Sequence, residues 1–368
     1  MTPTPFDDIR GHEALRGTLS RALEARRVAS ALLFHGPPGI GKLSVALAFL
    51  QALFCENPGA PCGACDSCRR LLGETVSHPD LALLFPRRAR PEAKEEPGES
   101  GAASGAVDLH LLQDEIRLNP SWKILADSTR EALSTLHLSP RQARRRGLLI
   151  LFAERLGSVS GNILLKALEE PPGKSVILLL TESPSALLAT IRSRCQPCRF
   201  APLARAAVES YLQERAGVSP ETSKRIASLS GGRIGSALAL ARDSDAYLER
   251  RDLLSRLLSE IRRDSSAAVC LAAAGVLLSE QEGTLEDLSI LMDILRDAML
   301  AGAGAPAAPL TRPPGPSDPP IPPLQAAFLL ARVEKAREDL RRNVNRQIAL
   351  EALCLDLANA SLSDAADA

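Results

Sequence analysis

The sequence predicts an α/β domain with a parallel β-sheet, followed by domains made only of helices. Three observations lead to this fold class. Short apolar runs alternate with helical patterns over residues 1–200, a glycine-rich loop joins the first run to a helical stretch, and the pattern after Pro202 is purely helical. At 368 residues the chain exceeds the size that one hydrophobic core usually supports, so we expect two or three domains.

The apolar runs are the predicted strands. They cover residues 31–34, 80–85, 148–152 and 176–180, and their apolar residues are continuous rather than alternating. Continuous runs are typical of strands that are buried on both faces. We therefore expect one parallel sheet with helices covering it.

The chain divides into three predicted domains, at residues 1–200, 201–243 and 244–360. Residues 86–106 are rich in Pro, Gly, Ala, Ser and charged side chains, so we expect a disordered insertion there. Residues 301–323 contain nine prolines between Pro306 and Pro323, which predicts an extended connector. We expect both segments to lie outside the packed cores.

The last predicted helix carries an apolar stripe. Its members recur at intervals of four, four, four and three residues, and they are Leu340, Val344, Ile348, Ala352 and Leu355. This spacing places them on one face of a helix, and we interpret that face as part of a core.

Composition and charge bound the function. The chain has 44 basic and 44 acidic residues, so it has no overall field that would attract nucleic acid or anionic lipid. Its start is polar, and no apolar run is long enough to span a membrane, so we expect a cytoplasmic protein without membrane contact. In that reducing compartment the eight cysteines are better interpreted as metal ligands or buried small side chains than as disulfides.

A predicted phosphate-binding loop follows the first strand and precedes a helical stretch. Its residues are Gly36, Gly39, Gly41 and Lys42. Glycines let the backbone N–H groups surround phosphates, the helix N-terminus adds positive potential, and the lysine reaches the outer phosphates. The loop therefore predicts a nucleotide site.

Residues needed for hydrolysis are missing. Leu43 stands where a Ser or Thr hydroxyl would bind magnesium, and the expected acidic pair falls on Leu151 and Phe152. Glu154 is expected to be a surface residue at the end of that strand. We predict that ATP binding is possible but that the chain does not hydrolyse ATP.

Four cysteines within 14 residues form a predicted metal site, at Cys55, Cys62, Cys65 and Cys68. Four thiolates suit a tetrahedral structural zinc ion; an iron–sulfur cluster and two disulfides are the alternatives. Cys195 and Cys198 form a second Cys-x-x-Cys pair, but it does not open a helix, so we interpret both as structural.

Several motifs together resemble the AAA+ clamp-loader subunits of bacterial DNA polymerase III. They are Phe6-Asp7-Asp8-Ile9-x-Gly11, the phosphate loop with the four-cysteine module after it, His78-Pro79-Asp80, residues 162–172, and the run from Thr190 to Cys195. The resemblance covers nearly the whole chain apart from residues 86 to 126 and the proline-rich connector. It implies a five-stranded parallel sheet with helices on both faces and a zinc-module insertion, then a small helical lid and a helical collar domain.

Within this family the pattern is that of the delta-prime subunits. Gly235 stands where the motor subunits carry a sensor arginine, whereas Arg194 is kept in the motif that supplies an arginine finger to a neighbouring ATP site. The resemblance therefore implies a subunit that lacks hydrolysis but assists it. The implied partners are the gamma/tau motor subunits and the delta subunit, with the sliding clamp and primer–template DNA contacted through the complex.

Other functions stay open at this point. The chain is alternatively a gamma/tau-like motor ATPase with a divergent site, a stand-alone zinc-containing P-loop protein, or a scaffold with an empty loop. The arginines at 141, 144, 145 and 146 are interpreted as a solvated loop, with phosphate contact as the alternative.

Overall fold

The computed structural model describes residues 6, 9–57, 61–72, 75–88, 106–119, 121–242, 244–278, 284–302, 321–341 and 344–359. Asp7, Asp8, Gly59 and most of the predicted insertion and connector lie outside this set. The chain forms two compact units: residues 1–211 with 231–236, and residues 212–230 with 237–368. The predicted division into three domains stays a prediction.

The first unit is built on a five-stranded parallel sheet, in the order β3-β5-β6-β1-β7. The strands are β1 (Ala31–His35), β3 (Leu81–Leu84), β5 (Arg146–Ile150), β6 (Ser175–Thr181) and β7 (Gln196–Arg199). Ala31 lies opposite Ile177, Leu81 opposite Gly147, and Leu32 opposite Gln196. The predicted fold class is confirmed, although β5 begins and ends two residues before the predicted run.

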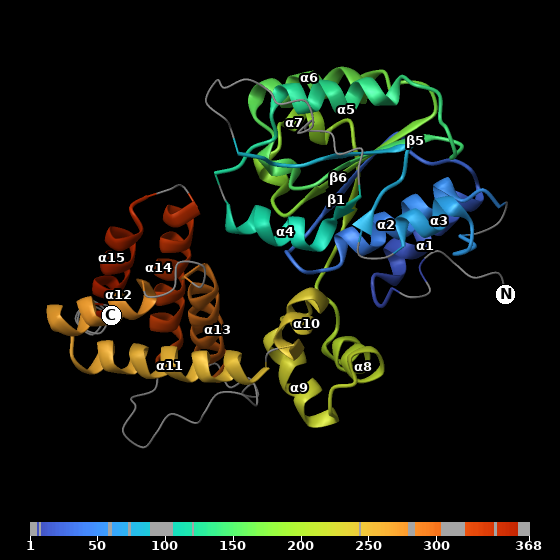
Figure 1. The fold of residues 1–368 in the computed structure, drawn as a ribbon. Helices are drawn as coiled ribbons and strands as arrows, with labels where there is room; N and C mark the ends of the chain where they lie inside the picture. Colours follow the sequence, from blue (N-terminus) through green and yellow to red (C-terminus); the bar gives the residue numbers. More distant parts are fainter. Residues whose placement is uncertain are drawn as a thin grey trace. The chain divides into compact units, whose positions relative to one another are not determined.

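Helices cover both faces of the sheet (Figure 1). One face carries α2 (Lys42–Phe54), α3 (Asp66–Leu71) and α4 (Leu109–Leu118), and the other carries α5 (Ala126–Leu136), α6 (Ser158–Glu169) and α7 (Ala189–Arg192). Alternate residues of each strand enter opposite cores: Leu32 and Phe34 pack with α2, whereas Ala31 and Leu33 pack with the α5–α6 layer. Both faces are therefore buried, which explains the continuous apolar runs.

Smaller elements complete the first unit. They are α1 (Glu13–Glu24), the 3-10 turns η1 (Ala153–Arg155) and η2 (Pro184–Ala186), and an antiparallel pair of short strands, β2 (Thr75–Val76) and β4 (Val107–Asp108). The pair β2–β4 brackets the predicted insertion, and Arg87 forms a bridge with Lys123. Both sides of the insertion are thus attached to the sheet domain.

Three short helices follow the sheet: α8 (Arg205–Ala216), α9 (Pro220–Leu229) and α10 (Ile234–Arg242). Ser219 caps the start of helix α9, since its Oγ accepts a hydrogen bond from Thr222 N at 3.2 Å. Pro220 is the first residue of the helix, where a proline is well tolerated. Residues 231–236, at the start of α10, belong to the first unit.

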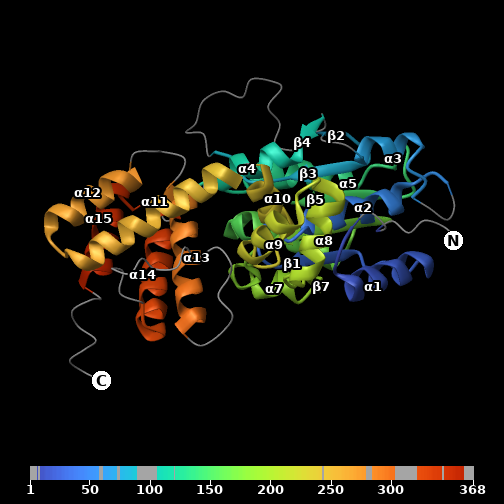
Figure 2. The same ribbon diagram turned by 90° about the horizontal axis from the view of Figure 1, so that it is seen from below.

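The rest of the second unit is a helical bundle, in which α13 and α14 lie side by side (Figure 2). Its helices are α11 (Ser244–Arg263), α12 (Ala267–Leu278), α13 (Thr284–Gly302), α14 (Pro323–Arg341) and α15 (Arg346–Asn359). Cys270 and Cys354 are buried in its core, as predicted. Helices α13 and α14 extend into both ends of the predicted connector, whereas residues 303–320 lie outside the described set.

The predicted core stripe is wrong for four of its five residues and does not lie on one helix. Leu340, which packs against the core, belongs to α14, and Val344 precedes α15. Val344, Ile348 and Leu355 are 43%, 61% and 44% exposed, and Ala352 is also exposed. The residues that α15 buries are Ala349, Leu350, Leu353, Cys354, Leu357 and Ala358. Helix α15 is apolar around much of its circumference, so its spacing alone did not determine which face packs inward.

Within the described residues, none of the helices combines the length and the apolar character that crossing a bilayer requires.

Candidate functional site

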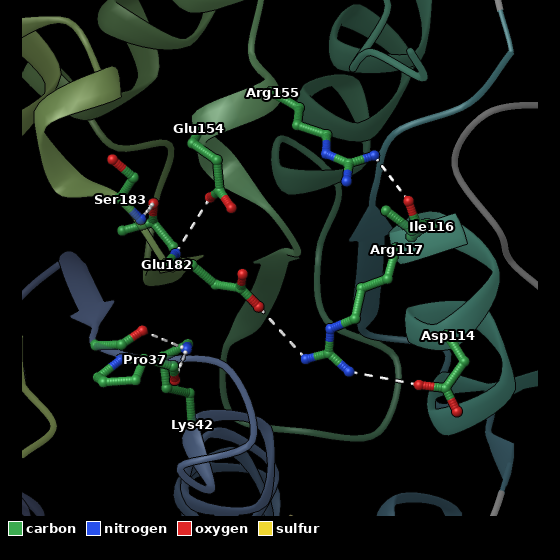
Figure 3. Close-up of polar contacts among 11 residues, drawn as sticks. Pro37, Lys42, Asp114, Ile116, Arg117, Glu154, Arg155, Glu182 and Ser183 are labelled. Atoms are coloured by element: carbon green, nitrogen blue, oxygen red, sulfur yellow. Dashed lines mark hydrogen bonds and ion pairs between the residues drawn. The ribbon is translucent and has the colours of Figure 1, made fainter. Parts of the chain in front are cut away.

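The glycine-rich loop lies between β1 and α2 and keeps the geometry of a phosphate loop. Gly39 and Gly41 adopt positive φ angles of 69° and 98°, which favour glycine. Lys42 begins α2, is 9% exposed, and its Nζ donates to the carbonyl oxygens of Gly36 and Pro37 at 2.7 Å each (Figure 3). The lysine is thus directed into its own loop, and a bound phosphate would compete with these two carbonyl oxygens for its ammonium group.

Residues that would bind magnesium are replaced by buried apolar side chains. Leu43 is 6% exposed, and Leu151 and Phe152 are 1% and 7% exposed. Phe152 has a φ of 50° and leaves the sheet just after β5. Its ring lies under the guanidinium groups of Arg117 and Arg155, whose Cζ atoms are 5.7 and 5.3 Å from the ring centroid. None of these three side chains offers an oxygen to a metal ion.

Two carboxylates, Glu154 and Glu182, act electrostatically on Lys42, and Figure 3 shows their hydrogen-bond partners. Glu154 Oε2 accepts a hydrogen bond from Glu182 N at 3.4 Å, and Glu182 Oε1 lies 3.4 Å from Arg117 Nη2. Burial lowers the pKa of Lys42 to about 8, although Glu182 and Glu154 act to raise it. Burial also raises the pKa of Glu154. The expected surface position of Glu154 is therefore corrected: it is half-buried and electrostatically coupled to Lys42.

The start of α10 lies directly on the phosphate loop. Gly235 N donates to Gly39 O at 2.7 Å. A Cβ atom at position 235 would lie 3.0 Å from both Gly39 Cα and Gly39 O. An arginine at this position would press on the loop, so the glycine suits the close backbone contact.

Four cysteines converge at the end of α2 and the start of α3. Their sulfur atoms all lie within 4.8 Å of one another, and the Cys55–Cys65 and Cys62–Cys68 sulfur pairs are 4.0 Å apart. In a tetrahedral zinc site, with Zn–S bonds of about 2.3 Å, sulfur atoms are about 3.8 Å apart. A disulfide would need about 2.05 Å. The site can therefore hold one metal ion, and its cysteines form no disulfides.

The chain around these cysteines orients their sulfur atoms. Cys62 Sγ accepts a hydrogen bond from Cys65 N at 3.3 Å, and Cys65 Sγ accepts one from Cys68 N at 3.4 Å. Hydrogen bonds from the Ala64 and Cys65 backbone lower the pKa of Cys62 to about 6, whereas burial raises the pKa of Cys55. Backbone N–H donors of this kind stabilise metal-binding thiolates.

Arg194 follows α7, and its side chain is 36% exposed. Its Nη2 lies 2.6 Å from Glu169 Oε1, and its Nη1 donates to Thr190 O at 3.0 Å. The guanidinium is thus on the surface of the first unit, outside the phosphate loop of its own chain. Cys195 and Cys198 next to it are buried, and burial raises the pKa of each thiol to about 11, which fits the predicted structural role.

The last arginine of the predicted solvated loop is instead the first residue of β5 and is buried. Arg146 is 6% exposed and donates to the carbonyls of Leu138, Ser139 and Pro79. Its Nη2 lies 3.6 Å from Asp80, which accepts hydrogen bonds at 2.7 Å from the backbone N–H groups of residues 141, 142 and 143. Arg146 is thus a structural residue, and the motif residue Asp80 is its partner.

These features define the class of protein. A parallel sheet with this strand order, a phosphate loop after β1 and a helix start packed on that loop form an AAA+-type P-loop module. The family model for "DNA polymerase III, delta subunit" matches residues 11–204, which is 194 of 368 residues. The chain belongs to this family.

Relatives from other bacteria agree with this assignment. DNA polymerase III subunit delta′ of Bacillus subtilis is 29% identical over 284 residues, which cover 76% of this chain and 75% of that protein. Subunit delta′ of Pseudomonas aeruginosa is 32% identical over 55% of this chain, and the match spans 53% of that relative. Subunit tau of Salmonella typhimurium is 31% identical over 52% of this chain and 25% of its own length.

Proposed function

We propose that this protein is a non-hydrolysing delta-prime-type subunit of the replicative clamp loader. In this role it supplies Arg194 as an arginine finger to the ATP site of a neighbouring motor subunit. Hydrolysis there would accompany loading of the sliding clamp on primed DNA. The observation that carries the proposal is that Arg194 is exposed on a domain in which apolar side chains occupy the positions expected to bind magnesium.

The chain's own phosphate loop supports binding without hydrolysis. Gly36, Gly39, Gly41 and Lys42 keep the cradle for phosphates, so ATP binding is compatible with the site. Leu43, Leu151 and Phe152 offer no oxygen ligands, and a P-loop enzyme needs magnesium to neutralise the charge that develops on the phosphates. A bound nucleotide would therefore stay intact.

The position of Arg194 supports a role in the ATP site of another subunit. A guanidinium binds the spreading charge of a transferring phosphoryl group, an effect of about 10³- to 10⁵-fold where it has been measured in GTPases. Arg194 lies outside its own phosphate loop and is part-exposed, which is compatible with a phosphate partner on a second chain. The relative named subunit tau suggests the gamma/tau subunits as that chain.

The remaining parts suit an assembled subunit. Zinc is the metal that four thiolates in this arrangement favour, and it would be structural because no coordination position stays open. Ile348 and Leu355 are exposed on α15, and Val344 is exposed just before it, which suits a collar that packs against neighbouring subunits. The delta subunit, the sliding clamp and primer–template DNA are the further proposed partners.

The test is ATP hydrolysis by the purified chain alone and after reconstitution with gamma/tau, delta, clamp and primed DNA. Arg194→Ala is compared with Arg192→Ala, which removes an exposed arginine two residues away. We expect the chain alone to be inactive, Arg194→Ala to lower the rate of the assembly at least tenfold, and Arg192→Ala to leave it near wild type. Hydrolysis by the chain alone that Lys42→Ala abolishes would instead identify a motor ATPase.

A further inference from the structure

Arg194 has an acidic partner within its own chain. We propose that Glu169 is the internal counterion of Arg194, and that a nucleotide phosphate of the neighbouring subunit must displace the Glu169 carboxylate before the finger acts. This inference rests on the proposed function. It assigns to Glu169 a positioning role that tunes how readily the assembly uses ATP.

The contact divides the donors of the guanidinium. Nη2 faces Glu169 Oε1 at 2.6 Å, and Nη1 donates to the backbone oxygen of Thr190 at 3.0 Å. Thr190 lies in α7, so this second bond holds the arginine against the helix that precedes it. These two contacts use one N–H donor on each terminal nitrogen, and the contact with Glu169 is the one in which a phosphate can replace the anion.

The position of Glu169 favours this pairing. It is the last residue of α6, where the helix dipole places partial negative charge and disfavours a carboxylate. A cation beside it relieves that repulsion. Helices α6 and α7 are packed together, because Gly161 leaves room for the Leu188 side chain and Ile191 is fully buried. Glu169 thus projects from the end of α6, and Arg194 projects from the segment that follows α7.

The strength of the ion pair suits a reversible exchange. The two side chains are 36% and 51% exposed, and ion pairs on the surface contribute little because water and salt screen them. A triphosphate carries more negative charge than one carboxylate and accepts two parallel N–H bonds from a guanidinium. The phosphate therefore wins the exchange, and the lost ion pair appears as a small reduction in affinity for ATP.

The experiment measures kcat and KM for ATP in the reconstituted assembly with Glu169→Gln. Glutamine keeps the size and loses the charge. We expect KM to fall about two- to fivefold, since exposed ion pairs have that strength, and kcat to stay unchanged. Glu170→Gln, which removes the neighbouring exposed carboxylate, is the matched control and should change neither constant. Glu169→Asp should give an intermediate KM.

Two further comparisons test the inference. In an Arg194→Ala background, Glu169→Gln should have no effect, since its partner is gone. A fall in kcat with an unchanged KM would mean that Glu169 orients the finger and does not compete with phosphate. If Glu169→Gln changed neither kcat nor KM, the ion pair would have no effect on ATP use and the inference would be wrong. The proposed function would still stand if Arg194→Ala lowered the rate as expected. An assembly insensitive to Arg194→Ala would overturn both.

Discussion

Asp80 is a carboxylate buried to 1% exposure, and it ties together two parts of the first unit. It accepts three backbone N–H bonds from the loop at residues 141–143 and faces the buried guanidinium of Arg146. Burial acts to raise its pKa, but the backbone donors and Arg146 outweigh it and hold the pKa below the usual value of 3.8. A single residue thus orders the whole arginine-rich loop before β5.

We expect Asp80→Asn to lower the free energy of unfolding by about 3 kcal/mol near neutral pH, because charge-assisted bonds weaken and Arg146 stays buried without its counterion. The control is Asp127→Asn, whose carboxylate is 88% exposed and should change stability by less than about 0.5 kcal/mol. Urea unfolding of both variants gives the measurement.

The pH dependence of the same variant has a defined sign. A carboxylate with a lowered folded-state pKa stabilises the protein fully above its unfolded pKa, and this contribution is lost as the pH falls through the folded value. The difference in free energy of unfolding between wild type and Asp80→Asn should therefore become smaller below about pH 4. A difference in unfolding free energy that grows in acid would contradict the lowered pKa of Asp80.

At the scale of elements, the cysteine module joins α2 to α3 through one site. Cys55 ends α2, and Cys65 caps α3. Glu56 also accepts hydrogen bonds from Ser67 N and Ser67 Oγ at 3.2 and 3.1 Å, which adds a link between the same two segments. A metal ion bound by the four cysteines would hold these two segments together.

We expect one zinc ion per chain, measured by atomic absorption after dialysis. Cys62→Ser and Cys68→Ser should lose the ion, and strong chelators should lower the thermal midpoint, since metal binding contributes to folding. Cys195→Ala is the control, because its buried sulfur lies outside the cluster and should leave the zinc content unchanged. Iron with inorganic sulfide in the purified protein would support the alternative cluster.

In the helical bundle, two ion pairs join α11 to α13. Arg250 donates to both oxygens of Asp287, at 2.8 and 2.6 Å, and Arg251 lies 2.7 Å from Asp297. The Asp287 side chain is 3% exposed. Buried pairs of this kind set which residues of two helices face each other, whereas their removal leaves an unpaired charge.

Asp287→Ala should therefore cost about 3–5 kcal/mol of stability in the second unit. Asp252→Ala removes an aspartate that is 52% exposed and 4.0 Å from Arg256, and it should cost less than about 0.5 kcal/mol. Thermal or urea unfolding followed by circular dichroism distinguishes them. If both variants were equally stable, the bidentate pair would not hold the helices together.

At the scale of the whole molecule, the last helix among the described residues, α15, carries apolar side chains that are exposed in that part of the chain. Ile348 and Leu355 are spaced by two turns on the exposed face of α15, and Val344 precedes them. Apolar groups in one stripe on a surface mark a contact with another protein more often than singly exposed ones do. This face is the structural basis of the proposed collar.

We expect Ile348→Asp to weaken assembly with the proposed motor subunits at least tenfold while leaving the thermal midpoint of the isolated chain unchanged. Leu111→Asp, at a 69% exposed position on α4, is the control and should assemble normally. Size-exclusion chromatography of the mixtures gives the result. If Ile348→Asp assembled normally, the exposed face of α15 would not be part of the proposed interface.

Much of the site was predictable because its residues are close together in the chain. The phosphate loop and the cysteine cluster each occupy fewer than 20 residues, so their spacing predicts their geometry. The apolar residues Leu43, Leu151 and Phe152 at the positions expected to bind magnesium were also identified from short motifs in the chain. Arg194 was found from its motif, but Glu169 was not, because 25 residues separate them and only the packing of α6 on α7 brings them together.

The sequence by itself therefore determined the α/β sheet domain, the helical remainder, the phosphate loop and the four-cysteine site, since periodicity and short spacings are properties of the chain. Only the tertiary structure decided which face of α15 is buried, that Arg146 is the ion-pair partner of Asp80, and that Glu154 acts electrostatically on Lys42. Each of these depends on contacts between segments far apart in sequence. Their free energies arise from burial and from paired charges, which exist only once the segments have packed.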